Sequence, residues 1–422
     1  MYETSYQEKG LLVLVQLEKK DLWPLEEQIE EFKNLVFSAG IEVIRLEVVK
    51  RKEISSALYI GKGKAEELGR IVEITEVNVV IFNNNLSFTQ QRNLEDILKV
   101  KTIDRTQLIL DIFARHAHTQ EGALQVELAQ LEYLLPRLKG KGIALSRLGG
   151  GIGTRGPGEK KLEVDRRRIS DKIVRLKKEL EEIRKHRDIQ RRRREKEKIS
   201  TCSLVGYTNA GKTTLFNALV STNQKTSDSL FTTLDPVSRV VSFDNHFRII
   251  LSDTVGFIYK LPPNLVEAFK ATLEELQYAD ILLHVVDSSS NFVKLISAVN
   301  EILGKLNLMS KHIILVFNKI DRIPSVTEEK IRSYYPGALF ISALKKINLG
   351  LIYTKIKEVL FAETKQFLIK FPFSAMEILD YLYKKGEVFK VEYGAEEVKV
   401  WAQIKNSFLS YLEKKGVILK EI

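Results

Sequence analysis

A chain of 422 residues, 44% of them hydrophobic, has room for two to four domains with sizeable cores. Its single cysteine, Cys202, excludes an internal disulfide framework and favours a reducing compartment. The polar first ten residues lack a signal-peptide core, and no apolar run approaches the ~20 residues of a membrane span. We therefore expect a cytoplasmic protein that is a monomer when free and has no stable membrane insertion.

The positive charge of the chain is concentrated in one segment. From Arg137 to Lys198 there are 23 Lys and Arg against 10 Asp and Glu, which gives this segment a net charge of +13. The whole chain has a net charge of +11, so the remaining residues together carry −2. Such a concentration is typical of a surface that binds an anionic partner, nucleic acid first of all. The alternative is a solvated, charged helix face, which is common.

Residues 1–108 alternate between strand and helix patterns, which indicates a small α/β domain with a partly parallel sheet. The predicted strands cover 11–17, 41–49 and 77–82, and the predicted helices cover 25–39 and 93–100. The segment from Tyr59 to Lys64 contains Gly-Lys-Gly-Lys, a weak phosphate-loop signal that we interpret as a turn.

Residues 109–198 are predicted to form a long antiparallel helical hairpin. Apolar residues recur at steps of four and three, the spacing of a coiled-coil seam. The two seams consist of Leu124, Leu128, Leu131, Leu135 and Leu138, and of Ile169, Ile173, Leu176, Leu180 and Ile183. Two such helices joined by one loop should fold back on each other. Pro136 is expected to end or kink the first helix near its tip.

The loop of this hairpin, residues 140–161, is predicted to be glycine-rich and basic. Its glycines cannot pack a core, but they allow a close approach to another backbone. Arg155, Lys160 and Lys161 would contact RNA, and Arg166, Arg167 and Arg168 would extend the basic face down the second helix. The alternative interpretation is a flexible linker.

The strongest single motif runs from Gly206 to Thr213 and reads Gly-Tyr-Thr-Asn-Ala-Gly-Lys-Thr. It follows an apolar strand pattern over 201–205 and precedes a helix pattern, the context in which backbone N–H groups hold phosphates. Lys212 would contact the β- and γ-phosphates, and the Thr213 hydroxyl would ligate Mg²⁺.

Two later motifs follow strand patterns and complete a phosphate and metal site. Asp253-Thr-Val-Gly256 offers a carboxylate that can hold Mg²⁺ through water and a Gly256 N–H for the γ-phosphate. Phe231-Thr-Thr-Leu-Asp235 offers Thr233 as the second hydroxyl ligand of Mg²⁺. We assign catalytic roles to Lys212, Thr233 and Gly256, because they act where charge develops.

Asn318-Lys-Ile-Asp321 follows a further strand and predicts selection of guanine. The Asp321 carboxylate can accept from N1–H and the exocyclic amine, a donor pair that adenine lacks. The predicted contacts with GTP and GDP are Gly206, Tyr207, Thr208, Asn209, Ala210, Gly211, Lys212, Thr213, Thr214, Phe231, Thr232, Thr233, Asp253, Gly256, Asn318, Lys319, Asp321, Ser342, Ala343 and Leu344.

The fold class that follows is α/β. A P-loop GTPase domain over 199–362, with a six-stranded, mostly parallel sheet, comes after the small α/β domain and the hairpin. Residues 363–422 are expected to form a small α+β domain with strand patterns at 367–371, 387–393, 397–404 and 417–419. That last domain shows no group of residues that predicts chemistry.

The chain resembles the bacterial HflX family of GTPases over nearly its whole length. The resemblance rests on the glycine-rich segment 149–159, on Leu162-Glu163 and 165–167, on 104–106 with 108–113, and on 231–236 and 253–257. It implies a GTPase with Mg²⁺ as cofactor that binds the large ribosomal subunit, its RNA and proteins, and can split or recycle ribosomes, often under stress. Lys160-Lys161, where members often have Thr-Gln, and Leu344, where many GTPases have Lys, are departures.

Position 257, where many GTPases place a Gln that orients the attacking water, is Phe. Phe257 cannot hydrogen-bond water, so we expect slow intrinsic hydrolysis that the ribosome stimulates; Phe257 is also consistent with a packed switch residue.

The leading hypothesis is an enzyme whose hydrolysis times its departure from the ribosome. The alternative is a GTP-gated ribosomal RNA-binding or assembly factor whose output does not need hydrolysis. A P-loop kinase is disfavoured by Asn318-Lys-Ile-Asp321.

Overall fold

The computed structural model describes residues 8–17, 23–146, 157–197, 199–220, 230–231, 233, 236–242, 248–259, 265, 270–361, 364–405 and 409–421. The chain forms two compact units. The first contains residues 1–186, 227–235 and 260–271, and the second contains residues 187–226, 236–259 and 272–422. The predicted four-domain division (1–108, 109–198, 199–362, 363–422) stays a prediction.

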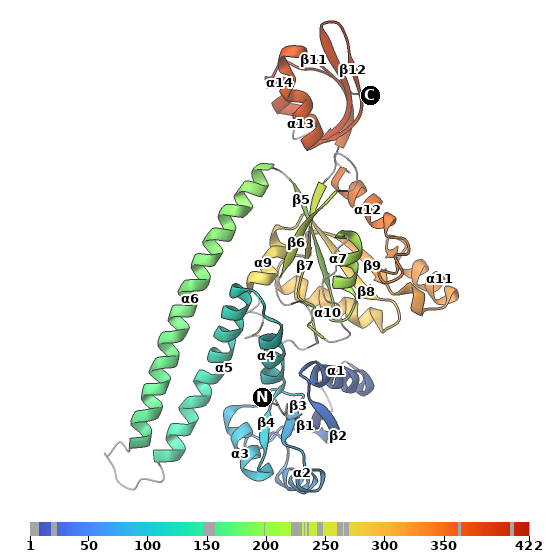
Figure 1. Ribbon diagram of the computed structural model, residues 1–422. Coiled ribbons are helices and arrows are strands. Elements are labelled where there is room, and N and C mark those ends of the chain that lie inside the picture. The colour runs from blue at the N-terminus through green and yellow to red at the C-terminus, as the bar shows by residue number, and fades with distance from the viewer. Residues whose placement is uncertain are drawn as a thin grey trace, which may run out of the picture. The chain divides into compact units, whose positions relative to one another are not determined.

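The first unit is built on a four-stranded parallel sheet with the order β2-β1-β3-β4 (Figure 1). Its strands are β1 (Lys9–Leu17), β2 (Glu42–Arg51), β3 (Val79–Phe82) and β4 (Lys101–Ile103), and its helices are α1 (Leu25–Ser38), α2 (Lys62–Thr75) and α3 (Phe88–Leu98). Because β1 is central, its residues Leu11 to Val15 are buried on both faces of the sheet.

Two details of this sheet and two of its neighbouring helices differ from the prediction. The pairings are all parallel, not partly so, and the short strand β4 was not predicted. The Gly-Lys-Gly-Lys segment is not a turn, because Gly61 is the N-cap of α2 and Lys62 is its first residue. The helix predicted from 93 begins five residues earlier, at Phe88, where Ser87 forms a capping box with Gln90.

The hairpin helices are α5 (Gln120–Ser146) and α6 (Pro157–Glu197), preceded by a separate helix α4 (Arg105–His116). Figure 1 shows α5 and α6 side by side, and the salt bridges Lys172–Glu127 and Lys177–Glu132 join them. The leucines predicted as the first seam are only partly buried. In α5 the buried residues are instead Val126, Ala129 and Tyr133, whereas in α6 Ile173 and Leu176 of the predicted second seam are buried.

The tip of the hairpin is shorter than predicted. Residues 140–146 continue α5, and residues 157–161 already belong to α6, so the loop prediction of 140–161 is wrong at both ends. Pro136 lies inside α5 and does not end it. Pro157 is the first residue of α6, where its missing N–H costs no hydrogen bond. Residues 147–156, which include Arg155, lie outside the described residues.

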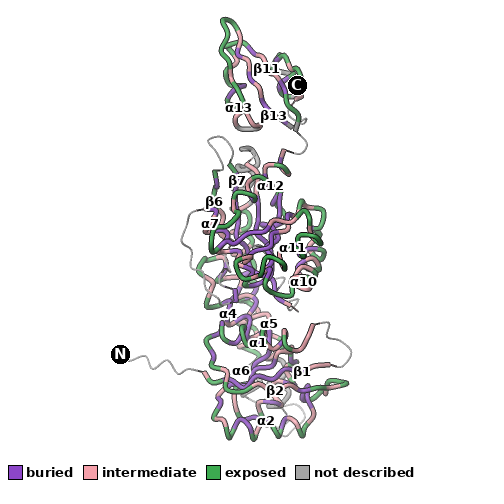
Figure 2. The backbone as a smooth tube through the Cα atoms, turned by 90° about the vertical axis from the view of Figure 1, so that its right-hand side faces the viewer, coloured by how far each residue is buried: buried purple, intermediate pink, exposed green. Residues whose placement is uncertain are grey.

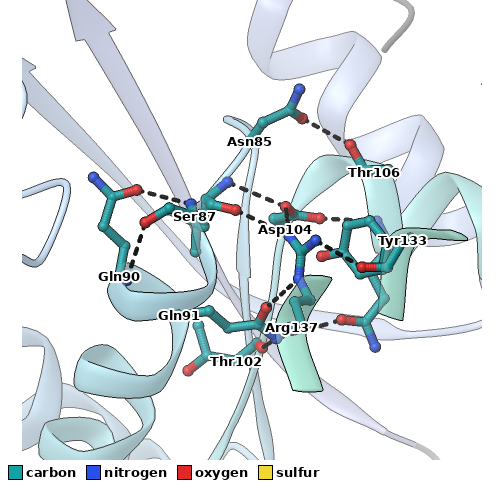
Figure 3. Close-up of polar contacts among 11 residues, drawn as sticks. Asn85, Ser87, Gln90, Gln91, Thr102, Asp104, Thr106, Tyr133 and Arg137 are labelled. Carbon is teal, nitrogen blue, oxygen red and sulfur yellow. Dashed lines mark hydrogen bonds and ion pairs between the residues drawn. The ribbon is translucent and has the colours of Figure 1, made fainter. Parts of the chain in front are cut away.

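A polar network attaches α5 to the parallel sheet (Figure 3). Asp104, which follows β4 and is 1% exposed, accepts hydrogen bonds from the N–H groups of Leu86 (3.1 Å) and Gln107 (2.9 Å). Arg137 of α5 donates to Asp104 (3.3 Å) and to the Leu86 carbonyl (3.0 Å), and its guanidinium lies 3.4 Å from the centre of the Tyr133 ring. The hairpin is therefore tied to the sheet by a charge pair in which Asp104 is buried and Arg137 is partly buried.

Replacing Asp104 by Ala is expected to lower the free energy of unfolding of the first unit by about 3 kcal/mol. The change removes the carboxylate partner of the partly buried Arg137 and the acceptor of two backbone N–H groups. Chemical denaturation of the full chain, followed by a probe in the first unit, measures the loss. Asp96→Ala, an exposed carboxylate on α3, is the matched control, and equal stability of the two variants would contradict the prediction.

The second unit contains a six-stranded sheet with the order β10-β9-β8-β5-β7-β6. Its strands are β5 (Ser200–Gly206), β6 (Val237–Ser242), β7 (Arg248–Asp253), β8 (Ile281–Asp287), β9 (His312–Asn318) and β10 (Leu339–Phe340). Four pairings are parallel, and β6 runs antiparallel to β7, so the prediction of six strands is confirmed and the sheet is mixed. Its helices are α7 (Lys212–Val220), α9 (Lys270–Tyr278), α10 (Phe292–Lys305), α11 (Ser325–Tyr334) and α12 (Gly350–Phe361).

The core of this sheet includes Cys202, whose thiol is buried and whose pKa burial raises, as expected for a core cysteine. Figure 2 shows that buried residues gather within the sheets, whereas the outward faces of helices such as α2 and α11 are exposed. Among the described residues, no helix combines the length and apolar content that a membrane span requires.

The chain ends in a four-stranded antiparallel sheet with the order β12-β13-β11-β14. Its elements are β11 (Thr364–Pro372), α13 (Glu377–Lys385), β12 (Glu387–Tyr393), β13 (Glu397–Lys405), α14 (Leu409–Lys414) and β14 (Ile418–Glu421). Phe367, Ile369 and Phe371 of β11 face its core, alternating with more exposed residues. The structure thus contains each of the four strands predicted here.

Candidate nucleotide-binding site

The glycine-rich turn joins the central strand β5 to helix α7, as predicted. Two of its glycines have backbones that other residues rarely adopt: φ is +154° at Gly206 and +88° at Gly211. A Cβ atom at Gly206 would lie 2.2 Å from the Val285 carbonyl oxygen, and one at Gly211 would lie 2.3 Å from the Asn318 amide nitrogen. The turn therefore requires glycine at both positions.

Lys212, the first residue of α7, is 6% exposed and points back into this turn. Its ammonium donates to the carbonyl oxygens of Gly206 (3.2 Å) and Tyr207 (2.8 Å). Burial lowers the pKa of Lys212 to about 8, and the nearby Asp253 opposes the shift. A buried ammonium of this kind suits the phosphates of a nucleotide, because an anionic partner compensates for the hydration that the ammonium loses on burial.

Because the pKa of Lys212 is about 8, we expect about half of the Lys212 side chains to be neutral at pH 8 in the nucleotide-free protein. A bound triphosphate favours the charged form and raises this pKa. We expect GTP binding at pH 8 to take up about half a proton per site. The affinity should therefore fall as the pH rises through 8.

Calorimetric titrations in buffers of different ionisation enthalpy measure this proton uptake. Below pH 7 Lys212 is already charged, so its contribution should vanish there, which provides an internal control. Binding at pH 8 without proton uptake would show that Lys212 stays charged in the free protein.

A hydroxyl and a carboxylate lie together beside the turn. The Thr213 hydroxyl donates to Asp253 Oδ2 at 2.7 Å, and Asp253 is fully buried at the end of β7. Oxygen ligands of this kind fit Mg²⁺, which usually keeps several waters and takes few protein ligands. Among the described residues no group of three or more His, Cys, Asp or Glu could hold a metal ion.

Gly256 lies against the turn, in close contact with Thr208 and Lys212. A Cβ atom there would lie 2.8 Å from Thr208 Cγ2 and 3.0 Å from Lys212 Nζ. The next residue, Phe257, is 3% exposed, and its backbone exchanges hydrogen bonds with Gly206 (3.1 Å) and Thr208 (2.8 Å). Phe257 is therefore a packed residue that joins this segment to the glycine-rich turn.

The predicted base-binding loops meet at Asn318, the last residue of β9. Its side-chain amide donates to the Ala210 carbonyl oxygen (2.9 Å) and accepts from the Ala343 N–H (2.9 Å). The Lys319 ammonium donates to the Asn209 carbonyl oxygen at 2.7 Å. Asn318 and Lys319 thus connect the glycine-rich turn with the segment Ser342–Leu344.

The carboxylate of Asp321 is available to a ligand, because the residue is exposed in a short 3-10 turn, Ile320–Arg322. Ser342 is buried, and its hydroxyl accepts from the Lys345 N–H (3.1 Å). Leu344 is 65% exposed. The structure therefore brings the turn, Asp253, Gly256 and the base-binding loops together in the second unit.

The segment before Thr233 belongs to the first unit. Phe231 is 3% exposed and packs edge to face on Phe113 of α4, with ring centres 4.6 Å apart. The Leu230 N–H donates to the hydroxyl of Ser38 at 2.8 Å. The predicted contacts of Phe231 and Thr233 with nucleotide stay predictions, and Thr232 lies outside the described residues.

The predicted RNA-binding residues are confined to the hairpin of the first unit. Arg166 and Arg168 form ion pairs one turn away with Glu163 (3.4 Å) and Asp165 (3.8 Å), and Arg167 is exposed. Lys160 and Lys161 belong to α6, but the structure describes only their backbone. Arg155 lies outside the described residues. These six residues keep the status of predictions.

A glycine-rich turn between strand and helix, a Thr–Asp pair and an Asn-Lys-Ile-Asp loop on one mixed sheet define a P-loop GTPase. Three family models match the chain: "GTP-binding GTPase N-terminal" over residues 26–114, "GTP-binding GTPase Middle Region" over 116–194 and "50S ribosome-binding GTPase" over 201–319. The chain belongs to the HflX family of GTPases, and it binds and hydrolyses GTP.

Two relatives show the extent of the match. The GTPase HflX of Caldanaerobacter subterraneus subsp. tengcongensis is 48% identical over 398 residues, 94% of this chain and 91% of the relative. The GTPase HflX of Escherichia coli K12 is 42% identical over 351 residues, 82% of each chain. A solved GTP-binding protein from Sulfolobus solfataricus in complex with GDP is 28% identical, with a TM-score of 0.44, and covers 84% of this chain and 98% of its own.

Proposed function

We propose that this GTPase binds the large (50S) ribosomal subunit and acts in ribosome splitting, recycling or rescue under stress. The observation that carries the proposal is the long basic hairpin α5–α6, which the Asp104–Arg137 pair ties to a folded domain in the same chain as the GTPase site. A stiff, basic projection suits a phosphate-rich surface. The family model "50S ribosome-binding GTPase" over residues 201–319 supports the same partner.

In the proposed mechanism, the glycine-rich turn and Lys212 bind the phosphates of GTP. Thr213, Thr233 and, through water, Asp253 would hold Mg²⁺, which would supply charge neutralisation for the phosphates. Asp321 would accept from the guanine edge, while the Lys319 stem would lie on the base ring. The Gly256 N–H would donate to the γ-phosphate in the transition state.

We further propose that hydrolysis is slow until the ribosome is bound. Phe257 has no hydrogen-bonding side chain and is packed against the turn, so it cannot orient a water molecule. An RNA phosphate or a ribosomal protein would supply the positioning group or order the switch. Phosphate-release assays with and without large subunits test this, and equal rates in the two would contradict it.

Replacing Arg155, Lys160 and Lys161 together by Gln is expected to weaken binding to large subunits. It should also flatten the salt dependence of binding, because fewer counterions are released. Cosedimentation across a salt series measures both effects. The basal GTPase rate should change little, since these residues lie outside the nucleotide motifs.

The matched control removes three exposed charges elsewhere in the first unit: Lys52→Gln, Lys62→Gln and Arg70→Gln. This control should bind subunits as the parent protein does. Normal binding of the hairpin variant at every salt concentration would assign the loop the role of a linker.

A GTP-gated RNA-binding or assembly factor that needs no turnover is the second candidate. It is favoured by Phe257, which removes the common water-orienting group. Splitting of ribosomes with a non-hydrolysable GTP analogue distinguishes the two for the splitting step. Full activity with the analogue favours the gated binder, and activity that requires GTP favours the enzyme.

A further inference from the structure

Asp287, the last residue of β8, lies opposite Asn318 in the parallel pairing of β8 with β9. Its Oδ2 accepts from the ammonium of Lys319 at 2.6 Å. Its other oxygen, Oδ1, accepts from the N–H (2.9 Å) and the hydroxyl (2.6 Å) of Ser289. Three hydrogen bonds therefore fix the direction in which this carboxylate holds Lys319.

The neighbouring Ser288 fixes the backbone of the same loop. Its N–H (2.9 Å) and its hydroxyl (2.7 Å) both donate to the Asn318 carbonyl oxygen. Lys319 itself has a left-handed backbone with φ +65°, so its side chain starts from a constrained position. The end of β8 thus holds the Asn318–Lys319 segment by both main chain and side chain.

We propose that Asp287 is a positioning residue of the guanine site, which holds the stem of Lys319 where the base ring lies. A lysine side chain has four rotatable bonds. If these bonds became fixed only when the nucleotide binds, the lost conformational entropy would lower the affinity for the nucleotide. Asp287 and the Asn209 carbonyl hold the ammonium of Lys319 between them before any ligand arrives. The side chains of Lys319 and Asp287 are only 14% and 15% exposed, so solvent weakens the pair less than it would at the surface.

The inference rests on the proposed contact of Lys319 with guanine, and two single variants separate the two ideas. Asp287→Asn keeps the shape but removes the charge, and it should lower the affinity for GTP and GDP by about tenfold. Lys319→Ala should also lower it. If Lys319→Ala binds normally, the base-site assignment fails; if only Asp287→Asn binds normally, the assignment stands and the role of Asp287 is refuted.

A double-mutant cycle provides the decisive comparison. Because Asp287 acts through Lys319, Asp287→Asn should cause no further loss in the Lys319→Ala background. Independent, multiplicative losses would show that Asp287 supports the fold and not the lysine. Fluorescent-nucleotide titrations and thermal unfolding of all four proteins give affinity and stability in parallel.

Asp280→Asn is the matched control, since Asp280 immediately precedes β8 at its other end and accepts from the Thr201 N–H (2.8 Å). This control should keep the parental affinity, and an equal loss would indicate general damage to the strand. Asp287→Glu, which retains the charge, should recover part of the affinity. The preference for guanine over xanthine should be unchanged in Asp287→Asn, because Asp321 still reads the base edge, and a changed preference would contradict the assigned role.

Discussion

Replacing Asp321 by Asn is expected to lower the affinity for GTP and GDP by about a hundredfold and to shift the preference toward xanthine nucleotides. The Asp321 carboxylate would accept hydrogen bonds from N1–H and from the exocyclic amine of guanine. The amide that replaces it has an NH₂ group in place of one of these acceptor oxygens, so two donors would face each other. In xanthine a carbonyl replaces that amine, so the amide finds an acceptor. Asp321 is exposed, and the change should therefore cost little stability.

Competition of guanine and xanthine nucleotides for the purified variant measures this switch. Glu329→Gln, another exposed carboxylate nearby in the chain, on α11, is the matched control and should keep the parental preference. Unchanged guanine preference in Asp321→Asn would remove Asp321 from the base site.

Replacing Gly211 by Ala should lower nucleotide affinity by at least about tenfold and destabilise the second unit by about 2 kcal/mol. The added methyl would meet the Asn318 amide nitrogen at 2.3 Å, on a backbone with φ +88° that alanine rarely adopts. Asn318 would have to move, and it holds both Ala210 and Ala343. The damage would therefore spread from the phosphate turn to the base-binding loops.

Gly304 provides the matched control, because it lies in α10 and nothing lies within 4 Å of its added Cβ. Gly304→Ala should be neutral or slightly stabilising, as alanine favours a helix. Nucleotide titration and chemical denaturation of both variants measure the effects. Parental affinity in Gly211→Ala would show that the loops move apart without loss of function.

Many residues of the candidate nucleotide site could be predicted to lie together, because they follow strands that end at one edge of the sheet. The pattern of Gly206 to Thr213 and the position of Asp253 after a strand predicted that Thr213 and Asp253 share a metal site, and the structure places these two side chains in contact. Asp287 was missed, although it also ends a buried strand. Its role depends on the register that places it opposite Asn318, and register between distant strands is not visible in the sequence.

The errors in the first unit have a similar origin. The strand β4 has only three residues, Lys101–Ile103, too few for a periodic pattern to be recognised. The leucine spacing predicted helices correctly but not the face of α5 that is buried, because Val126, Ala129 and Tyr133 form that face. The helix boundaries at 146 and 157 were missed because the glycines of segment 140–161 favoured a loop, although Pro157 is compatible with the first position of a helix.

The packing of Leu230 and Phe231 affects how this protein should be divided for experiments. In sequence these residues lie inside the predicted GTPase segment, yet their partners, Ser38 of α1 and Phe113 of α4, lie more than a hundred residues earlier in the chain. A fragment that begins at residue 199 would lack both partners. Leu230 and Phe231, which lie close to Thr233 in the sequence, would then lose the contacts that bury them. Kinetic constants measured on such a truncated protein would describe an altered switch segment, so only the full chain provides a valid baseline for comparing hydrolysis rates.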